Sequence, residues 1–518
     1  MNERSLNVQT ARGSRAAVSS GHPMASAEAI RVLRDGGNII DAAIAGAAVL
    51  SVVLPYACGI GGDMYLLYYD PKTARMHGLN GTGAAPSGAV PGRFPDGIPQ
   101  AGIHSATVPG VVAAWEDALE RFGTRTLHDL LQPAIRCARE GFPVHRGMIE
   151  NAHEKQSLIS RNDEAARLFL PGGRVPEPGQ TVVQTDLARS LARIAEGGAR
   201  EFYAGALAEN MLRRIEALGG LFVTEDLARH RTLWQEPMHA RIYGHEIFTM
   251  PPNSLGLGLL LQLLAFQAAD DGAADPVSFW QQTIAAWRWA HRVSDGLIGD
   301  PGDSVALAEA LLEKTASDPS SIGLPGPGPG ALPASGDTSN LVIIDSGGSA
   351  VSLVQSVSGP FASGIVLEGT GVLLNNRMRG FNTREGSVNC VAPGRRPAHT
   401  LVPAMIARDG EVVMSIGTPG AAGQTITLAQ VLVRMLARGQ SPGEAIAAPR
   451  WSIAPSGRII VERTAPPPVI SELRRSEPDL ELLDVRNVRF GSVKAAWRDG
   501  SSVHAVADYR RVAAARAW

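Results

Sequence analysis

A Pro- and Gly-rich stretch runs directly into an apolar segment, and this junction constrains the fold more than any other part of the chain. The stretch covers residues 316–337 and contains few large apolar side chains. It cannot bury enough surface to offset the entropy lost on ordering, so we expect a flexible tail there. A loose segment of this length inside a compact chain is either functional or a boundary.

The residues after the stretch predict a hairpin in the core. Residues 340–345 (NLVIID) have the composition of a buried strand, residues 346–349 (SGGS) are typical of a turn, and residues 350–357 (AVSLVQSV) alternate apolar with small polar side chains. Thr338 stands where the loose stretch meets the strand. The sequence therefore predicts that a flexible segment is joined to a rigid strand at a threonine.

Thr338 has two interpretations. A threonine before a strand is commonly a cap or turn residue. It can also be a nucleophile if the chain is cut just before it, because the freed α-amino group has a pKa of about 7.7–8 and can take the hydroxyl proton. Such chemistry needs an expendable segment upstream and a rigid strand downstream, and both are present.

The composition narrows the class of protein. The chain has 518 residues, of which 44% are hydrophobic and 19% charged, and its formal net charge is -2, so neither nucleic acid nor an anionic membrane is an expected partner. The three cysteines are far apart, which argues against a disulfide framework or a zinc site. We see no signal peptide, and the longest apolar runs are shorter than the roughly 20 residues of a membrane span. These features predict a soluble cytoplasmic protein.

Three further motifs have both a structural and a functional interpretation. GIGGD (residues 59–63) lacks the spacing of a phosphate-binding loop and favours a tight turn with closely approaching backbones. GTPGAAGQ (residues 417–424) follows a predicted strand and is either an oxyanion-binding loop or a plain strand-to-helix turn. In RRPAHTLVP (residues 395–403), His399 could bind substrate or act as an acid, although a structural role is the more common one.

Taken in order, these motifs resemble the γ-glutamyltransferase family of N-terminal-nucleophile hydrolases. The similarity includes GHPMASAEAIRVLRDGGNIIDAAIAGAAVLSVVLPYACGIGGD, TVPGVVAAWEDALERFG, LLQPAIRCAREGFPV, the block beginning GDTSNLVIID, RRPAHTLVPAMI and GTPGAAGQ. It extends over nearly the whole chain. The resemblance implies an α+β fold, a four-layer αββα sandwich, formed as one compact unit by two subunits that arise from self-cleavage.

The resemblance also implies roles for individual residues. The cut would fall between Asp337 and Thr338, giving a large subunit of residues 1–337 and a small subunit of residues 338–518 that begins with the nucleophile Thr338. Ser356 matches a second hydroxyl near the nucleophile. Gly420 and Ala421 match the pair whose backbone N–H groups form the oxyanion hole, and alanine keeps the N–H that this role needs.

The residues that hold an amino-acid substrate differ from the family pattern. Thr82 stands about where an arginine is expected, and Gly380 replaces the aspartate that pairs with the substrate α-amino group. Ser358 and Arg377 replace an asparagine and a glutamine, while His399 and Thr400 replace two serines. Loss of the aspartate removes a charge-assisted contact. The Arg377 guanidinium can bind a substrate carboxylate through two hydrogen bonds, although a structural ion pair is an equal alternative.

These replacements favour the branch that contains oxamate amidohydrolase and the glutaryl-cephalosporin acylases. The leading hypothesis is a self-processing amidohydrolase or acyltransferase that cleaves a small carboxylate-bearing amide, with water or an amine as the acceptor, and needs no metal or organic cofactor. One alternative is a glutathione hydrolase or γ-glutamyltransferase in which the residues that hold the amino-acid part of the substrate are altered. A second is a catalytically silent binding or scaffold protein.

Overall fold

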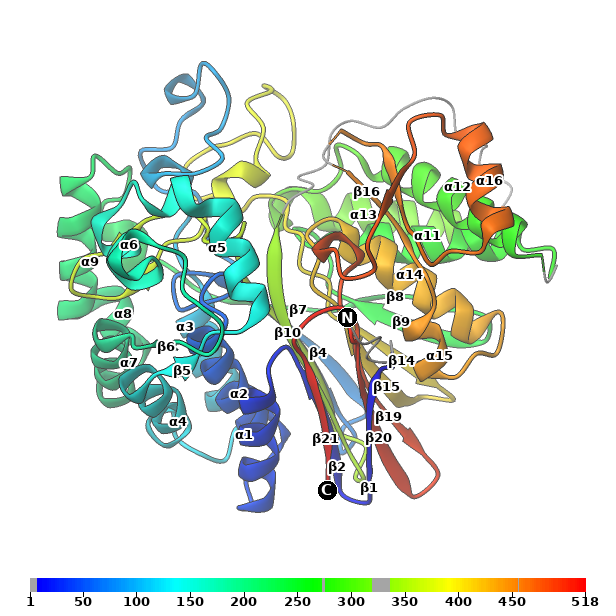
Figure 1. The fold of residues 1–518 in the computed structure, drawn as a ribbon, viewed down its shortest axis with the longest axis horizontal. Helices are drawn as coiled ribbons and strands as arrows, with labels where there is room; N and C mark the ends of the chain where they lie inside the picture. The colour runs from blue at the N-terminus through cyan, green and yellow to red at the C-terminus, as the bar shows by residue number, and fades with distance from the viewer. Residues whose placement is uncertain (1–6, 273–274, 319–335, 455) are drawn as a thin grey trace.

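Two seven-stranded sheets lie face to face at the centre of the molecule, and helices cover the outer face of each (Figure 1). The structure is a computed structural model that describes residues 7–272, 275–318, 336–454 and 456–518. The layers follow the order helix, sheet, sheet, helix, so the predicted αββα sandwich is confirmed. Most of the predicted flexible tail, residues 319–335, lies outside the described residues.

The first sheet contains the strand that begins at Asp337. Its order is β21-β2-β10-β11-β3-β4-β7, and all neighbours are antiparallel. Its strands are β2 (Ala16–Ser20), β3 (Asp63–Asp70), β4 (Arg75–Gly81), β7 (Leu233–Gln235), β10 (Asp337–Asp345), β11 (Ala350–Ser358) and β21 (Ala514–Ala517). The predicted hairpin is present as β10 and β11, with Leu341 opposite Leu353.

The second sheet has the order β1-β20-β19-β15-β14-β9-β8. Its strands are β1 (Gln9–Gly13), β8 (Met238–Ile242), β9 (His245–Thr249), β14 (Ala404–Arg408), β15 (Glu411–Gly417), β19 (Lys494–Asp499) and β20 (Ser502–Ala507). Shorter strands lie outside the two large sheets: β5 (Phe142–Pro143), β6 (Thr181–Val182), β12 (Val366–Leu367), β13 (Val372–Leu373), β16 (Trp451–Ile453), β17 (Ile459–Glu462) and β18 (Glu481–Leu483).

Helices from the first part of the chain cover the first sheet. They are α1 (Pro23–Arg34), α2 (Ile39–Val53), α3 (Val111–Phe122), α4 (Leu127–Glu140), α5 (Arg146–Ile159), α6 (Asp163–Phe169), α7 (Thr185–Gly197), α8 (Ala199–Ala204), α9 (Ala206–Ala217) and α10 (Thr224–Ala228). Every residue of α2 is buried, as its uniformly apolar sequence predicts. Its N-terminus is fixed by a capping box between Asn38 and Asp41.

The helices on the second sheet come from both halves of the chain. They are α11 (Gly256–Ala269), α12 (Pro276–Ser294), α13 (Pro301–Ser317), α14 (Gly423–Leu436), α15 (Pro442–Ala447) and α16 (Pro467–Ser476). Among the described residues, no helix is both long enough and apolar enough to cross a membrane.

Strand β10 is apolar on both faces because it separates two cores. Leu341 and Ile343 pack into the core under the helices of the first layer, whereas Val342 and Ile344 pack into the core between the sheets. Alternate side chains of a strand point to opposite faces, so a strand covered on both sides needs a continuous apolar run. Core packing on both faces thus fixes the strand that begins beside Thr338.

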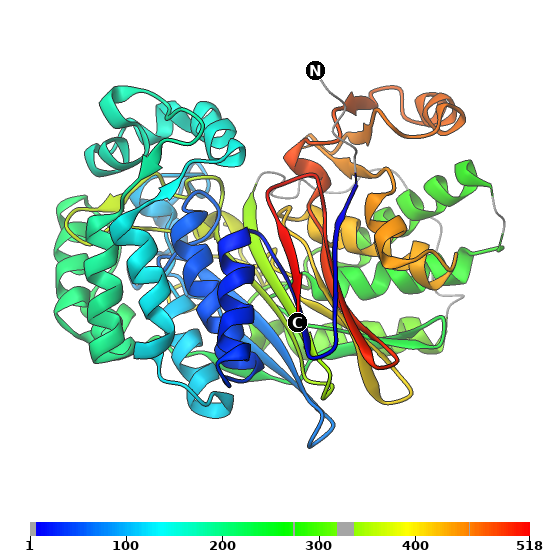
Figure 2. The same cartoon turned by 60° about the horizontal axis from the view of Figure 1, so that its bottom comes forward.

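Each sheet combines strands that precede Thr338 in the sequence with strands that follow it. β2 lies between β21 and β10, and β3 pairs with β11. In the second sheet, β1 pairs with β20 and β9 with β14. Figure 2 shows the N-terminal strands, drawn in blue, among red and yellow-green strands from the last third of the chain. Neither part of the chain forms a complete sheet alone.

Candidate functional site

Thr338 is the second residue of β10 and is buried, with 4% of its surface exposed. The pairing of β10 with β11 is irregular between Asp337 and Ser339. An irregularity of this kind re-aims a side chain and is common next to active sites. The Thr338 hydroxyl lies 3.5 Å from Nε2 of Gln424, a buried residue in the first turn of α14.

Both polar groups of the peptide bond that precedes Thr338, its C=O and its N–H, form hydrogen bonds. Its carbonyl oxygen, from Asp337, accepts a hydrogen bond from Ser356 Oγ at 2.7 Å. Its N–H, from Thr338, donates to Asp337 Oδ1 at 2.8 Å. Ser356 Oγ in turn accepts from the N–H of Ser358 at 2.8 Å, and Ser358 has a positive φ of 89°. The backbone turn at Ser358 therefore orients the hydroxyl that contacts this peptide.

The loop between β15 and α14 lies beside the same peptide. Gly420 and Ala421 have φ values of 136° and 51°. The Gly420 carbonyl accepts from the Gly423 N–H at 2.9 Å, which ties the loop to the first turn of α14. A Cβ placed on Gly336 would lie 2.8 Å from Ala421 Cβ, so the chain just before Thr338 packs against this loop. Backbone N–H groups in such a loop can bind a developing oxyanion.

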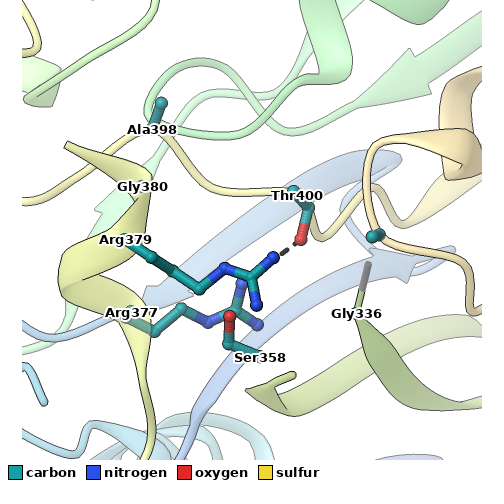
Figure 3. A pocket seen from close by; sticks show the side chains of 8 residues that line it. Gly336, Ser358, Arg377, Arg379, Gly380, Ala398 and Thr400 are labelled. Atoms are coloured by element: carbon teal, nitrogen blue, oxygen red, sulfur yellow. Dashed lines mark hydrogen bonds between the residues drawn. The ribbon is translucent and has the colours of Figure 1, made fainter. Parts of the chain in front are cut away.

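A pocket that begins at Gly336, two residues before Thr338, is lined by cationic and small residues (Figure 3). The lining residues are Gly336, Ser358, Arg377, Arg379, Gly380, Ala398, Thr400 and Ala421. Arg377, Arg379 and Gly380 belong to one short 3-10 turn, η5 (Arg377–Gly380). The pocket therefore extends from Gly336 and Ala421 to this turn.

Arg377 is buried, and its guanidinium has few partners. Nη1 donates to Thr400 Oγ1 at 3.2 Å, and Nε lies 3.4 Å from Asp63 Oδ2, whereas Nη2 has no hydrogen-bond partner among the described residues. Burial lowers the pKa of Arg377 to about 10, and the nearby Asp63 carboxylate opposes this shift. The guanidinium therefore stays protonated at neutral pH and keeps donor capacity for a further anion.

Asp63 connects Arg377 to His399, which is fully buried. His399 Nε2 lies 3.1 Å from Asp63 Oδ2, and Asp63 Oδ1 accepts from the Gly83 N–H at 3.0 Å. Burial lowers the pKa of His399 to about 4, and the Arg377 charge acts in the same direction. His399 is thus neutral at physiological pH. It contacts Asp63 and is not among the residues that line the pocket. Thr400, the next residue, does line it.

Two of the positions that differ from the family pattern are closely constrained. Gly380 packs against residues 397–398, and a Cβ there would lie 2.6 Å from the Ala398 carbonyl oxygen. Thr82 does not line the pocket: its hydroxyl donates to Asn80 Oδ1 at 2.6 Å, and its carbonyl accepts from Arg396 Nε at 2.9 Å, inside a buried network.

Sequence reasoning missed three residues of this site. Asp63 was assigned only to the GIGGD turn, Gln424 was only the end of the GTPGAAGQ motif, and Arg379 was not considered. The close backbone approach predicted for GIGGD is present, since a Cβ on Gly62 would lie 2.4 Å from the Ser356 carbonyl oxygen. The signal for Arg379 was its place two residues after Arg377 in the same turn.

The αββα sandwich, with a buried threonine at the start of a central strand, matches the architecture of the N-terminal-nucleophile class of hydrolases. Residues 25–518 match the model of the protein family described as "Gamma-glutamyltranspeptidase". The chain belongs to this family of enzymes.

Relatives with known names have several activities. The chain is 34% identical over 449 residues to the glutathione hydrolase-like YwrD proenzyme of Bacillus subtilis, covering 85% of each protein. It is 31% identical over 478 residues to the oxamate amidohydrolase proenzyme of Klebsiella pneumoniae, covering 89% of this chain and 90% of that one. Among solved structures, it is similar to cephalosporin acylase from Bacillus halodurans, with a TM-score of 0.90, 29% identity and coverage of 100% and 98%.

Proposed function

We propose that this chain is a precursor that cleaves itself between Asp337 and Thr338 and then hydrolyses or transfers the acyl group of a small amide that carries a carboxylate. The observation that carries the proposal is the position of Thr338. The carbonyl oxygen of Asp337, in the peptide bond before Thr338, accepts a hydrogen bond from Ser356 Oγ, and a nearby pocket is lined by two arginines. Residues 1–337 and 338–518 would be the two subunits of one heterodimer.

Self-cleavage would proceed by transfer of the acyl group from nitrogen to oxygen. Thr338 Oγ attacks the carbonyl carbon of Asp337, a C–O bond forms, and the C–N bond to Thr338 breaks. The hydroxyl proton passes to the Thr338 nitrogen, which becomes the free α-amino group. Water then hydrolyses the ester, leaving a carboxylate on Asp337 and restoring the Thr338 hydroxyl. Ser356 is in contact with the carbonyl oxygen of the bond to be cleaved.

Substrate turnover would use the same hydroxyl and the new amino group. The α-amino group takes the proton of Thr338 Oγ as the hydroxyl attacks the substrate carbonyl, and then gives it to the leaving amine. Water or an amine acceptor releases the acyl group from the enzyme. The backbone N–H groups of Gly420 and Ala421 would bind the oxyanion of each tetrahedral intermediate.

The charges around the pocket favour an acyl group that carries a carboxylate. Arg377 and Arg379 line the pocket, and among the described residues Asp63 is the one whose carboxylate lies within 4 Å of Arg377. Arg377 Nη2 has no hydrogen-bond partner among the described residues, so this guanidinium can bind a substrate carboxylate. Gly380 supplies no carboxylate for an α-amino group, so we expect an acid amide without one. Ser358 and Thr400 offer hydroxyls to the same pocket.

The first test is cleavage of the purified protein. Wild type should give two fragments on a denaturing gel, and mass spectrometry should show that the smaller one begins at Thr338. Thr338→Ala should remain a single chain without amidase activity, because it lacks the hydroxyl. Thr338→Ser, which keeps a hydroxyl, is the matched control and should still be cleaved. A fully cleaved Thr338→Ala protein would refute the assignment of the nucleophile.

A substrate panel separates the remaining alternatives. Turnover of oxamate or glutaryl amides, with little turnover of a γ-glutamyl anilide, would support the proposal. Robust turnover of the anilide would instead favour a γ-glutamyl enzyme in which the residues that hold the glutamyl group are altered. A wild-type chain that stays intact and inactive would favour the silent binding protein. The cytoplasmic location expected from the sequence stays a prediction.

A further inference from the structure

Asp337, the residue before the proposed cleavage site, is held by a buried ion pair. Its Oδ1 pairs with Nη1 of Arg511, a residue in the segment between β20 and β21. Both side chains are shielded, with 4% of Asp337 and 13% of Arg511 exposed. Surface ion pairs of long side chains contribute little, whereas a shielded pair keeps its geometry. This pair therefore constrains where the Asp337 carboxylate lies.

The carboxylate faces the nitrogen of the bond that would break. The same Oδ1 that pairs with Arg511 accepts the Thr338 N–H at 2.8 Å, while Ser356 Oγ donates to the Asp337 carbonyl oxygen at 2.7 Å. The two edges of this peptide are thus bonded to different partners. Arg511 does not touch the peptide itself; it acts through the carboxylate.

Arg511 also connects this peptide to the loop that contains Gly420. Its Nη2 donates to the carbonyl of Val488, in the 3-10 turn η6 (Val488–Phe490). The next residue, Gly491, packs against the loop: a Cβ on it would lie 2.7 Å from Thr418 Oγ1. The guanidinium therefore bridges the Asp337 carboxylate and the turn behind the proposed oxyanion loop.

We propose that Arg511 is a positioning residue for self-cleavage, and that it holds the Asp337 carboxylate against the nitrogen of the bond to be cleaved. This inference rests on the proposed cleavage between Asp337 and Thr338. As Thr338 Oγ bonds to the carbonyl carbon and the C–N bond breaks, the nitrogen receives the hydroxyl proton and gains positive character. A carboxylate fixed beside it stabilises that charge and keeps the peptide oriented toward the hydroxyl.

The ion pair with Asp337 acts on the peptide bond only until that bond is cut, whereas the hydrogen bond of Arg511 to Val488 remains afterwards. This difference separates positioning for cleavage from a general structural role. After hydrolysis Asp337 is no longer bonded to Thr338, so its ion pair with Arg511 no longer orients the peptide that carries the nucleophile. Loss of the Arg511 side chain should therefore slow cleavage without an equal loss of substrate turnover by the molecules that have been cleaved. A merely structural arginine would affect cleavage, turnover and thermal stability together.

The test follows cleavage of newly made chains in cell-free translation, sampled on denaturing gels after synthesis is stopped. Arg511→Met and Asp337→Asn should each slow cleavage roughly 10- to 100-fold. The double variant should be no slower than the slower single variant, because both remove one interaction. Arg511→Lys should recover part of the rate. Arg498→Met is the matched control, since Arg498 forms an exposed ion pair with Glu411, and it should cleave normally.

The outcomes distinguish this inference from the proposed function. Wild type that gives no fragment beginning at Thr338 overturns the cleavage site and the role of Arg511 together. Wild type that is cleaved there, with Arg511→Met cleaved at the same rate, overturns the role of Arg511 alone. The role is also rejected if Arg511→Met slows cleavage, has a lower melting temperature and shows an equally large fall in turnover per cleaved molecule. Slow cleavage with normal turnover per cleaved molecule supports it.

Discussion

At the scale of single residues, we expect Arg377 to select the substrates that the pocket accepts. It lines the pocket and donates to Thr400, but it also lies 3.4 Å from Asp63. We predict that Arg377→Gln lowers kcat/KM for a carboxylate-bearing amide roughly 100-fold or more, because a shielded charge-assisted contact is lost. Steady-state kinetics on that amide and on its uncharged analogue measure the effect.

The uncharged analogue distinguishes the two interpretations of Arg377. If the guanidinium binds the substrate carboxylate, the variant should lose activity on the charged amide while keeping most of its activity on the uncharged one. If Arg377 serves only to neutralise Asp63, both substrates should lose activity equally. The second pattern would contradict the proposed substrate class, although Thr338 could still be the nucleophile.

At the scale of elements, the turn η5 holds Arg377, Arg379 and Gly380 against residues 397–398. A side chain at Gly380 would meet the Ala398 carbonyl oxygen at 2.6 Å, so the turn would have to move. We predict that Gly380→Asp, which restores the residue type of the γ-glutamyl enzymes, lowers stability by about 1–3 kcal/mol and creates no γ-glutamyl activity. Denaturant unfolding and an assay with a γ-glutamyl anilide provide the measurements.

A second 3-10 turn supplies the control for this substitution. Gly92 lies in η1 (Pro91–Arg93), and a Cβ there would meet nothing within 4 Å. Gly92→Asp should therefore leave both stability and activity close to wild type. Substantial γ-glutamyl turnover by Gly380→Asp would show that the turn adapts, and that substrate choice depends on one side chain rather than on the packing of the turn.

At the scale of the whole molecule, the two proposed subunits share both sheets. β2 lies between β21 and β10, and β1 pairs with β20, so residues 1–337 and 338–518 cannot part without exposing both sheet cores. We predict that the cleaved fragments co-elute on size-exclusion chromatography, even at high salt, and separate only in denaturant. Burial of apolar surface, which salt does not weaken, is the reason.

The uncleaved Thr338→Ala chain is the reference for this experiment. It should elute at the same volume as the cleaved protein, because the strands and their packing are the same. Fragments that separate under native conditions would contradict the interleaved sheets. The result does not depend on the substrate, so it tests the architecture separately from the activity.

Much of the local structure could be predicted because short-range patterns carry it. The apolar run of β10, the uniformly apolar α2 and the hairpin turn at residues 346–349 are all present. The glycines of GIGGD also approach other backbones as expected. The partners of Asp63 could not be predicted, since its contacts with Arg377 and His399 cross more than 300 positions of sequence. Thr82, by contrast, was expected near substrate and lies in a buried network.

The sequence by itself determined the family, through motifs in collinear order, and the resemblance implied the class of fold. It also determined the threonine at the start of a core strand, because strand periodicity and turn residues are properties of neighbouring positions. Only the tertiary structure decided which charges meet. It brings Arg377 and Arg379 into one pocket, places neutral His399 behind Asp63, and pairs Arg511 with Asp337. Electrostatic interactions depend on distance and burial in three dimensions, and neither can be read from spacing along the chain.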